Sequence, residues 1–255
     1  FREGILFVYV PADKEKQEII DFLSRREEVI CELLKERMPS MVSFCVLVAD
    51  LQDSIKISTE LLAGEYFELI NDLWKTLSTS FEKYYGIYGK HAGDGMLYFF
   101  LKRPGTNYIM DAICCALELR EKMKKFSSEW KVRKGWLNDI YLNIGINEGQ
   151  EFFGTIRSAS HIEFTALGDT INYAGRLSDF ASFGSIWTTK NVINKLDQED
   201  RQKITFGIRR KDQDKEIFIQ ETFARLVDLL DPAEKQHSRF LGLATLPVTE
   251  IVDTT

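Results

Sequence analysis

Two aspartates have sequence surroundings that suit carboxylate groups in a metal-binding site. Asp50 ends the apolar run 41–50 (MVSFCVLVAD), and Asp94 lies in the tight turn Gly93-Asp94-Gly95. A nearly all-apolar run is typical of a strand buried on both faces, and an Asp-Gly pair is a hairpin signal. On neighbouring strands the two carboxylates would repel each other and recruit divalent cations such as Mg²⁺ with a triphosphate. Taken singly, each aspartate is more typical of a solvated residue at a strand end or turn.

The elements that must position these aspartates follow from the hydrophobic pattern. The expected segments are strand 41–50, helix 54–84, strands 87–91 and 96–101, helix 107–126 with Asn107 as its cap, strands 140–148 and 152–156 paired around Gly149, a helix from about 169, and strands 185–188, 204–210 and 217–221. The order β-α-β-β-α-β predicts an α/β (α+β) fold, a ferredoxin-like palm sheet with covering helices on one face.

The chain divides into three predicted parts. Residues 1–40 hold a short strand (5–10) and a charged amphipathic helix (12–37), which either packs on its own domain or pairs across a dimer as a signalling helix. Residues 41–223 form the central domain. Residues 224–255 lack a clear period and are expected to run over the surface as a C-terminal extension. The chain begins at Phe1 without Met, which leaves room for a sensor or membrane anchor upstream.

Composition excludes several classes of function. The net charge of −6 and the pI of about 5.3 argue against a nucleic-acid surface, which needs a basic face. No apolar run reaches the length of a membrane span. The four cysteines form no CxxC spacing, and free thiols fit a reducing, cytoplasmic compartment.

Four blocks, taken together, resemble the class III adenylyl and guanylyl cyclases. They are Val46–Leu51 (VLVADL), Tyr88–Met96 (YGKHAGDGM), Gly145–Gly154 (GINEGQEFFG) and Phe164–Leu177 (FTALGDTINYAGRL). The blocks keep the order and spacing of the family over about residues 42–221.

The resemblance implies a metal-dependent reaction. Asp50 and Asp94 match the two metal-ligating aspartates, and Leu51 matches a position that offers a backbone carbonyl. The implied cofactors are two Mg²⁺ or Mn²⁺ ions per site. The implied activity is adenylate cyclase: ATP is converted to 3′,5′-cyclic AMP and pyrophosphate at the interface of a homodimer.

Further residues match the positions that handle the nucleotide. Asn172 and Arg176 match the ribose-orienting and transition-state residues, and their i, i+4 spacing places them on one helix face. Lys90 and Thr165 match the two positions that read the purine. Lys there with a hydroxyl residue is the adenylyl pattern, whereas guanylyl cyclases carry Glu with a small residue such as Cys.

The sequence also departs from the family. The usual Gly-Phe-Thr or Gly-Ser-Thr stretch reads Asp53-Ser54-Ile55, where backbone amides are expected to bind phosphate and Asp53 to cap the helix. The second transition-state cation, usually a lysine, is assigned to Lys211, with Arg210 as its substitute, although the loop aligns poorly.

Four alternatives stay open. The domain could be a silent nucleotide-binding regulatory module, a guanylate cyclase, a diguanylate cyclase or an unassigned soluble α/β domain. The complete set of metal, purine and transition-state residues argues against the silent module. Ala92-Gly93-Asp94-Gly95-Met96 lacks the acidic residue that follows the Gly-Gly-Asp/Glu of diguanylate cyclases.

Overall fold

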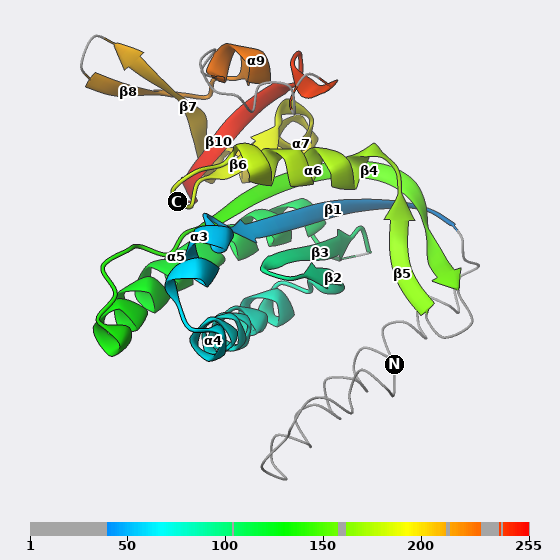
Figure 1. The fold of residues 1–255 in the computed structure, drawn as a ribbon. Coiled ribbons are helices and arrows are strands. Elements are labelled where there is room, and N and C mark those ends of the chain that lie inside the picture. The colour runs from blue at the N-terminus through cyan, green and yellow to red at the C-terminus, as the bar shows by residue number, and fades with distance from the viewer. Residues whose placement is uncertain are drawn as a thin grey trace. The chain divides into compact units, whose positions relative to one another are not determined.

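The computed structural model describes residues 40–103, 105–157, 162–212, 215–230, 240 and 242–254 (Figure 1). The expected strand 5–10 and helix 12–37 lie outside these residues. The described chain forms two compact units: a larger one of residues 43–149 and 169–254, and a smaller one of residues 40–42 and 150–168.

The sheet order confirms the ferredoxin-like core. The strands β1 (Ser40–Leu51), β2 (Ile87–Ala92), β3 (Gly95–Leu101) and β4 (Leu142–Arg157) lie side by side in the order β2-β3-β1-β4. β3 pairs antiparallel with both β1 and β2, so the neighbour of β1 is the second strand of the hairpin. Beyond β4 the sheet continues with β6 (Ile186–Thr189), β10 (Pro247–Thr254), β7 (Ile204–Asp212) and β8 (Lys215–Gln220).

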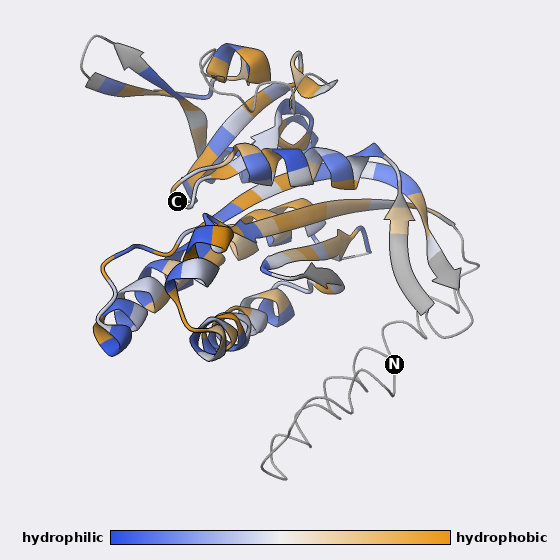
Figure 2. Ribbon diagram, viewed as in Figure 1, coloured by the Kyte–Doolittle hydropathy of each residue, from blue (hydrophilic) through white to orange (hydrophobic). Residues whose placement is uncertain are grey.

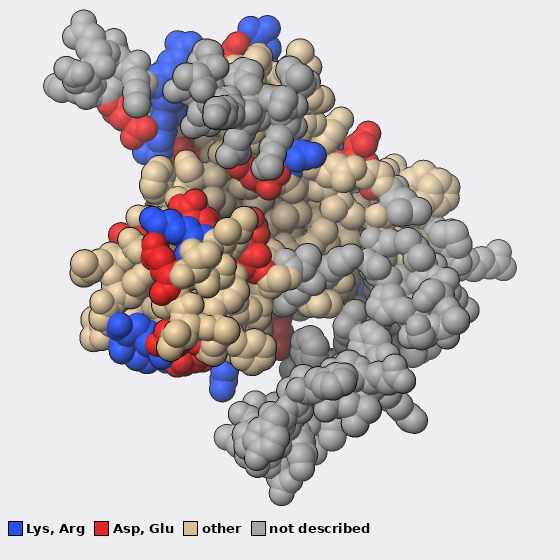
Figure 3. Space-filling view, viewed as in Figure 1, with Lys and Arg blue, Asp and Glu red and all other residues tan. Residues whose placement is uncertain are grey.

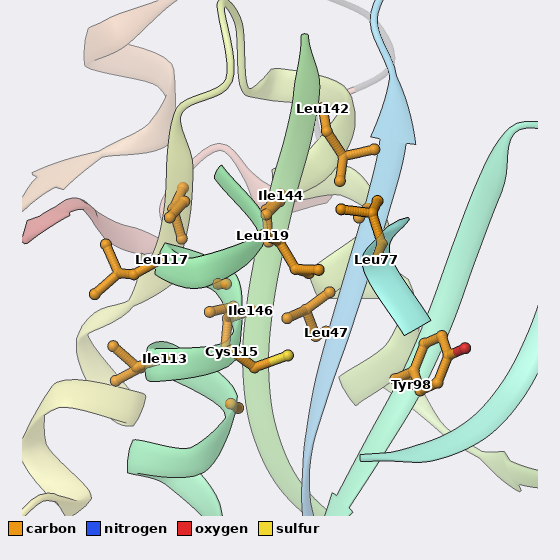
Figure 4. Close-up of a cluster of buried hydrophobic side chains, with 14 of the residues drawn as sticks. Leu47, Leu77, Tyr98, Ile113, Cys115, Leu117, Leu119, Leu142, Ile144 and Ile146 are labelled. Atoms are coloured by element: carbon orange, nitrogen blue, oxygen red, sulfur yellow. The ribbon is translucent and has the colours of Figure 1, made fainter. Parts of the chain in front are cut away.

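The main hydrophobic core fills one face of this sheet. Helices α4 (Ala63–Lys83) and α5 (Tyr108–Lys134) bury Leu77 and Leu119 against Leu47 of β1 and Ile144 of β4 (Figure 4). β1 is hydrophobic along most of its length, as expected for a strand covered on both faces (Figure 2). Of the described cysteines, Cys45 and Cys115 are buried free thiols.

A second cluster fills the opposite face under α6 (Asp169–Phe180). Successive strand residues point to opposite faces, and β6 accordingly sends Ile186 into the main core and Trp187 into the second cluster. Leu177 of α6 is fully buried there. The sheet therefore holds α6 on the face opposite α4 and α5.

Two glycines bring α6 close to β4. A Cβ on Gly145 would lie 2.0 Å from the Ala174 carbonyl oxygen, and one on Gly149 would lie 2.1 Å from Thr170 Oγ1. The expected turn at Gly149 is therefore wrong: the two strands expected at 140–148 and 152–156 are one strand, Leu142–Arg157, in which Gly149 serves close packing. The far part of β4 pairs with β5 (Ile162–Leu167), from Phe152 opposite Leu167 to Arg157 opposite Ile162.

The C-terminal residues do not simply run over the surface. β10 lies inside the sheet between β6 and β7, with Val248 and Ile251 fully buried. The sequence hid this strand because polar residues also face inward. Thr249 Oγ1 donates to the Gly207 and Thr222 carbonyls at 3.1 and 3.0 Å, and buried Glu250 accepts from Arg209 Nε at 2.7 Å.

Other boundaries shift in smaller ways. The expected helix 54–84 is broken into α3 (Ser54–Glu60) and α4, while α5 extends eight residues past its expected end at 126. Asn107 caps α5 as expected, with Oδ1 3.4 Å from the Met110 nitrogen. The unexpected short elements are α7 (Lys190–Lys195), α8 (Gln198–Gln202), β9 (Ala224–Arg225) and α9 (Leu226–Leu229).

The glycine contact predicts a stability difference between two similar substitutions. Gly145→Ala should lower the free energy of unfolding by roughly 1–3 kcal/mol, because the new methyl group must displace α6. At Gly175, within α6, nothing lies within 4 Å of the place that a methyl group would take. Gly175→Ala should therefore be neutral or stabilise by roughly 0.5–1 kcal/mol. Urea unfolding of both variants measures this, and an equal loss in both would contradict the close packing.

Candidate functional site

The sheet register brings the two aspartates together. Ala49 of β1 lies opposite Met96 of β3, so the next residue, Asp50, reaches the end of the sheet beside the turn that holds Asp94. That turn has two residues between Ala92 and Gly95, and Gly93 adopts a φ of 67°. A glycine with positive φ at the first turn position is typical of a type II′ hairpin. The juxtaposition expected from sequence is therefore present, through β3 rather than β2.

The two carboxylates act on each other electrostatically. The pKa of Asp50 is raised from 3.8 to about 6, first by burial, then by the charge of Asp94, and then by that of Asp179, against a backbone hydrogen bond at Leu51 that lowers it. An elevated pKa means that the folded protein disfavours the ionised Asp50. A cation bound between Asp50 and Asp94 would instead favour the ionised form of Asp50.

The donor chemistry fits a hard divalent cation. Asp50 and Asp94 offer carboxylate oxygens, and the chain continues directly into the backbone carbonyl of Leu51. Within the described residues no group of three or more His, Cys, Asp or Glu side chains is arranged to hold a metal. A cation here would therefore complete its coordination with water and with substrate oxygens, as Mg²⁺ commonly does.

Tyr66 is a member of this site that sequence reasoning missed. The helical pattern gives it only a place on the apolar face of α4, and it does pack partly buried against the main core. Its pKa is raised by burial and by the charges of Asp94 and Asp50, so the charges of both carboxylates act on its phenol. The signal in the sequence is a single hydroxyl on an otherwise apolar helix face.

The loop after Asp50 holds an unusual backbone. Asp53 adopts a left-handed φ of 55°, a conformation that glycine favours, and glycine is the residue that the resemblance implies at this position. Asp53 stands at the N-cap position of α3, but its side chain makes no capping hydrogen bond, so the expected capping role is wrong. In the left-handed conformation, its carboxylate instead accepts a long contact of 3.5 Å from Gln52 Nε2.

Gln52 ties this loop to two other segments. Its backbone nitrogen donates to the Tyr141 carbonyl at 3.0 Å, and its Oε1 accepts from the Phe183 nitrogen at 2.7 Å. Phe183 follows α6 and also has a positive φ of 52°. The end of β1 is thus hydrogen-bonded to the loop that leaves α6.

The exposed face of α6 carries three polar side chains. Asn172, Arg176 and Asp179 follow one another at i, i+4 and i+7, and all three are exposed, while Ala174 and Leu177 are buried on the opposite face. This confirms the shared helix face expected for Asn172 and Arg176. Arg176 Nη1 lies 3.3 Å from Asp179 Oδ2.

Two polar residues of the third sequence block have structural partners. Asn147 Nδ2 donates to the Thr170 carbonyl at 3.3 Å, and its Oδ1 accepts from Thr189 Oγ1 at 3.1 Å. Buried Glu148 accepts from Tyr108 Oη at 2.9 Å and forms an ion pair with Lys195. These contacts anchor β4 to α6, β6 and α7.

The remaining expected site residues are placed by backbone only. Lys90 lies on β2 opposite Leu97, directly after an irregularity in the pairing at Gly89. Thr165 lies on β5 opposite Gly154 in the smaller unit. Lys211 lies on β7 opposite Glu216, and three strands separate β7 from β1. Their roles stay predictions.

The surface mixes charges of both signs. On the face shown in Figure 3, Lys and Arg lie beside Asp and Glu. Between α5 and α4, Lys134 pairs with Glu68 at 2.7 Å and Arg133 with Asp72 at 2.6 Å. Among the described residues, no helix is long and apolar enough to cross a membrane.

Comparison with known proteins gives a family match over most of the chain. Residues 36–217 match the adenylate and guanylate cyclase catalytic domain family. An adenylate cyclase of Anabaena cylindrica is 25% identical over 186 residues, which cover 70% of this chain and 36% of that protein. The chain thus spans about a third of the length of this curated relative.

Solved structures show the same fold. The adenylyl cyclase CyaB from P. aeruginosa superposes with a TM-score of 0.65 at 19% identity, covering 85% of this chain and 96% of that one. The guanylate cyclase domain of RhGC from Catenaria anguillulae, in complex with GTP, gives 0.63 at 16% identity, covering 84% and 98%. The adenylyl cyclase and the guanylate cyclase structure thus match this fold with nearly the same TM-score.

The raised pKa of Asp50 predicts a distinctive pH dependence of stability. Its folded-state pKa is about 6 against 3.8, so its contribution to stability is present below about pH 4 and is lost as the pH rises through about 6. In metal-free buffer, Asp50→Asn should therefore become more stable than wild type above about pH 6. Mg²⁺ or Mn²⁺ should reduce this difference in stability, because the ion stabilises only the wild-type protein.

Thermal unfolding across this pH range measures the effect. Asp53→Asn removes an exposed carboxylate three residues away and should follow the wild-type curve. Parallel curves for wild type and Asp50→Asn, with or without metal, would contradict the electrostatic description of the site.

Proposed function

Because the chain belongs to the adenylate and guanylate cyclase catalytic domain family, we propose that it converts ATP to 3′,5′-cyclic AMP and pyrophosphate. The observation that carries this proposal is the pair of carboxylates, Asp50 and Asp94, at the end of β1 and in the β2–β3 turn. Burial of Asp50, and then the charge of Asp94, raise the pKa of Asp50, and a bound divalent cation would offset both effects.

Asp50 and Asp94 would hold two Mg²⁺ or Mn²⁺ ions, with the Leu51 carbonyl as a further ligand. When bound, the ions supply the positive charge that lowers the pKa of the ribose 3′-hydroxyl and offsets charge on the phosphates. The protein's own contribution is to fix the two carboxylates on hydrogen-bonded backbone, because β1 and β3 are paired up to Ala49 and Met96. Rigid placement lowers the entropic cost of bringing the 3′-oxygen and α-phosphorus together.

Asn172 and Arg176 would act on the ribose and on the α-phosphate. Asn172 can accept and donate hydrogen bonds to the ribose, and the Arg176 guanidinium can donate to phosphate oxygens as negative charge builds on them. Both side chains project from an exposed face of α6, as is needed for residues that complete a site on another subunit.

Lys90 and Thr165 are proposed to read the base. Adenine offers ring nitrogens that accept and one exocyclic amine that donates, which suits a lysine and a hydroxyl. A site built on hydrogen bonds rejects the wrong base because buried polar groups are then left unpaired. Lys211, with Arg210 as its substitute, is proposed as the second transition-state cation, and the backbone at Asp53 and Ser54 as a phosphate contact.

The active form is proposed to be a homodimer. Lys211 lies on β7, which is separated from β1 by β4, β6 and β10, and α6 covers the face away from α4 and α5. A two-fold dimer would bring the carboxylates of one chain to the α6 residues of the other and build two equal sites. An upstream sensor or membrane domain would act by changing the geometry of this dimer.

A direct assay tests the proposed reaction. Wild-type protein with Mn²⁺ and ATP should form cyclic AMP faster than it forms cyclic GMP from GTP. Asp94→Ala should lower the rate by ~100-fold or more, because one of two metal carboxylates is gone. Asp139→Asn removes an exposed carboxylate that pairs with Lys131 at 2.6 Å and should keep the wild-type rate.

Two other outcomes would replace the proposal. Faster turnover of GTP would identify a guanylate cyclase. Binding of ATP without any cyclic product would identify a silent regulatory module.

A further inference from the structure

The exposed face of α6 holds an ion pair that the reaction as proposed does not require. Arg176 Nη1 and Asp179 Oδ2 lie 3.3 Å apart, three residues apart along the helix. Within the described part of the chain, Asp179 is the hydrogen-bond partner of the Arg176 guanidinium. The carboxylate therefore acts on the side chain to which transition-state stabilisation is assigned.

The helix turn that carries this pair is firmly anchored. Ser178 Oγ donates to the Asn143 carbonyl at 3.0 Å, and the Phe180 ring packs edge-on against Trp187 with 4.8 Å between centroids. Leu177, which precedes Ser178, is fully buried. Asp179 thus projects from a fixed backbone, and a fixed carboxylate can hold a flexible arginine in one direction.

The contact leaves most of the guanidinium available. One nitrogen of Arg176 is held, whereas Arg225 is held twice by Asp228, at 2.8 Å through Nε and 2.9 Å through Nη2. Arginine has five N–H donors in a rigid fork. The single contact at Arg176 therefore orients its guanidinium and leaves N–H donors for a phosphate, whereas the double contact at Arg225 uses two of its nitrogens.

The pair also lies close to the metal end of the chain. The loop after α6 is hydrogen-bonded to Gln52, two residues after Asp50, through the Phe183 nitrogen at 2.7 Å. The side chains of Arg176 and Asp179 are 47% and 42% exposed. The Arg176 guanidinium is therefore open to the phosphate of a nucleotide held by the metal carboxylates of a second chain.

We propose that Asp179 is a positioning residue for Arg176, holding one guanidinium nitrogen so that the others face the phosphate in the transition state. This inference rests on the proposed cyclase function. Exposed ion pairs are weak, so the contact restricts the arginine without withholding it from the substrate. Its loss should affect turnover more than substrate binding, because the arginine interaction strengthens as charge builds on the phosphate.

Steady-state kinetics of cyclic nucleotide formation tests the role. Asp179→Asn should lower kcat about fivefold with KM for ATP nearly unchanged, and Asp179→Glu should recover most of the rate because it restores the charge. Asp72→Asn, which breaks the exposed Arg133–Asp72 pair between α5 and α4 (2.6 Å), should leave kcat unchanged. In an Arg176→Ala background, Asp179→Asn should have no further effect on the residual rate.

Each other result has a definite meaning. An unchanged kcat, a raised kcat, or independent effects of Asp179→Asn and Arg176→Ala would overturn the positioning role while leaving the cyclase proposal intact. A wild-type protein that forms neither cyclic AMP nor cyclic GMP would overturn the proposed function, and the role of Asp179 with it.

Discussion

The partial burial of Asp50 beside the charge of Asp94 is the constraint on which the site depends. The fold forces the two carboxylates together: β1 and β3 are locked in register up to Ala49 and Met96, and a two-residue turn places Asp94 at the same edge. Partial burial removes the water that would otherwise screen the charges, and the pKa of Asp50 rises to about 6. Ionised Asp50 is therefore unfavourable in the metal-free protein, and a bound divalent cation would stabilise the folded state by offsetting this effect.

The surrounding structure keeps that geometry rigid. Asp53 occupies a left-handed backbone position, and Gln52 ties the loop to Tyr141, which precedes β4, and to Phe183, which follows α6. On the other face of the sheet, Gly145 and Gly149 let α6 approach β4 closely, which fixes an exposed stripe of Asn172, Arg176 and Asp179. One chain thus presents an anionic half and a polar, arginine-bearing half, and two-fold pairing would join them into complete sites.

Much of this was predictable from sequence because it rests on local chemistry. The buried run before Asp50, the Gly93-Asp94 turn and the i, i+4 spacing of Asn172 and Arg176 each have a simple pattern, and the structure confirms them. Features that depend on tertiary contacts were missed. Gly149 reads as a turn but serves close packing, β10 was hidden by inward-facing Thr249 and Glu250, and Tyr66 reads as part of an apolar helix face although it lies near two carboxylates.

The central claim, that two chains share each site, is tested most directly by mixing two inactive variants. Asp50→Ala lacks a metal carboxylate and Asn172→Ala lacks a group on α6, so each homodimer should be nearly inactive. Equal amounts, co-refolded, should give about half mixed dimers, each with one intact site, and the activity should return to about a quarter of wild type. Mixed dimers that form, as shown by mass, without recovery of cyclic nucleotide synthesis would contradict the shared site.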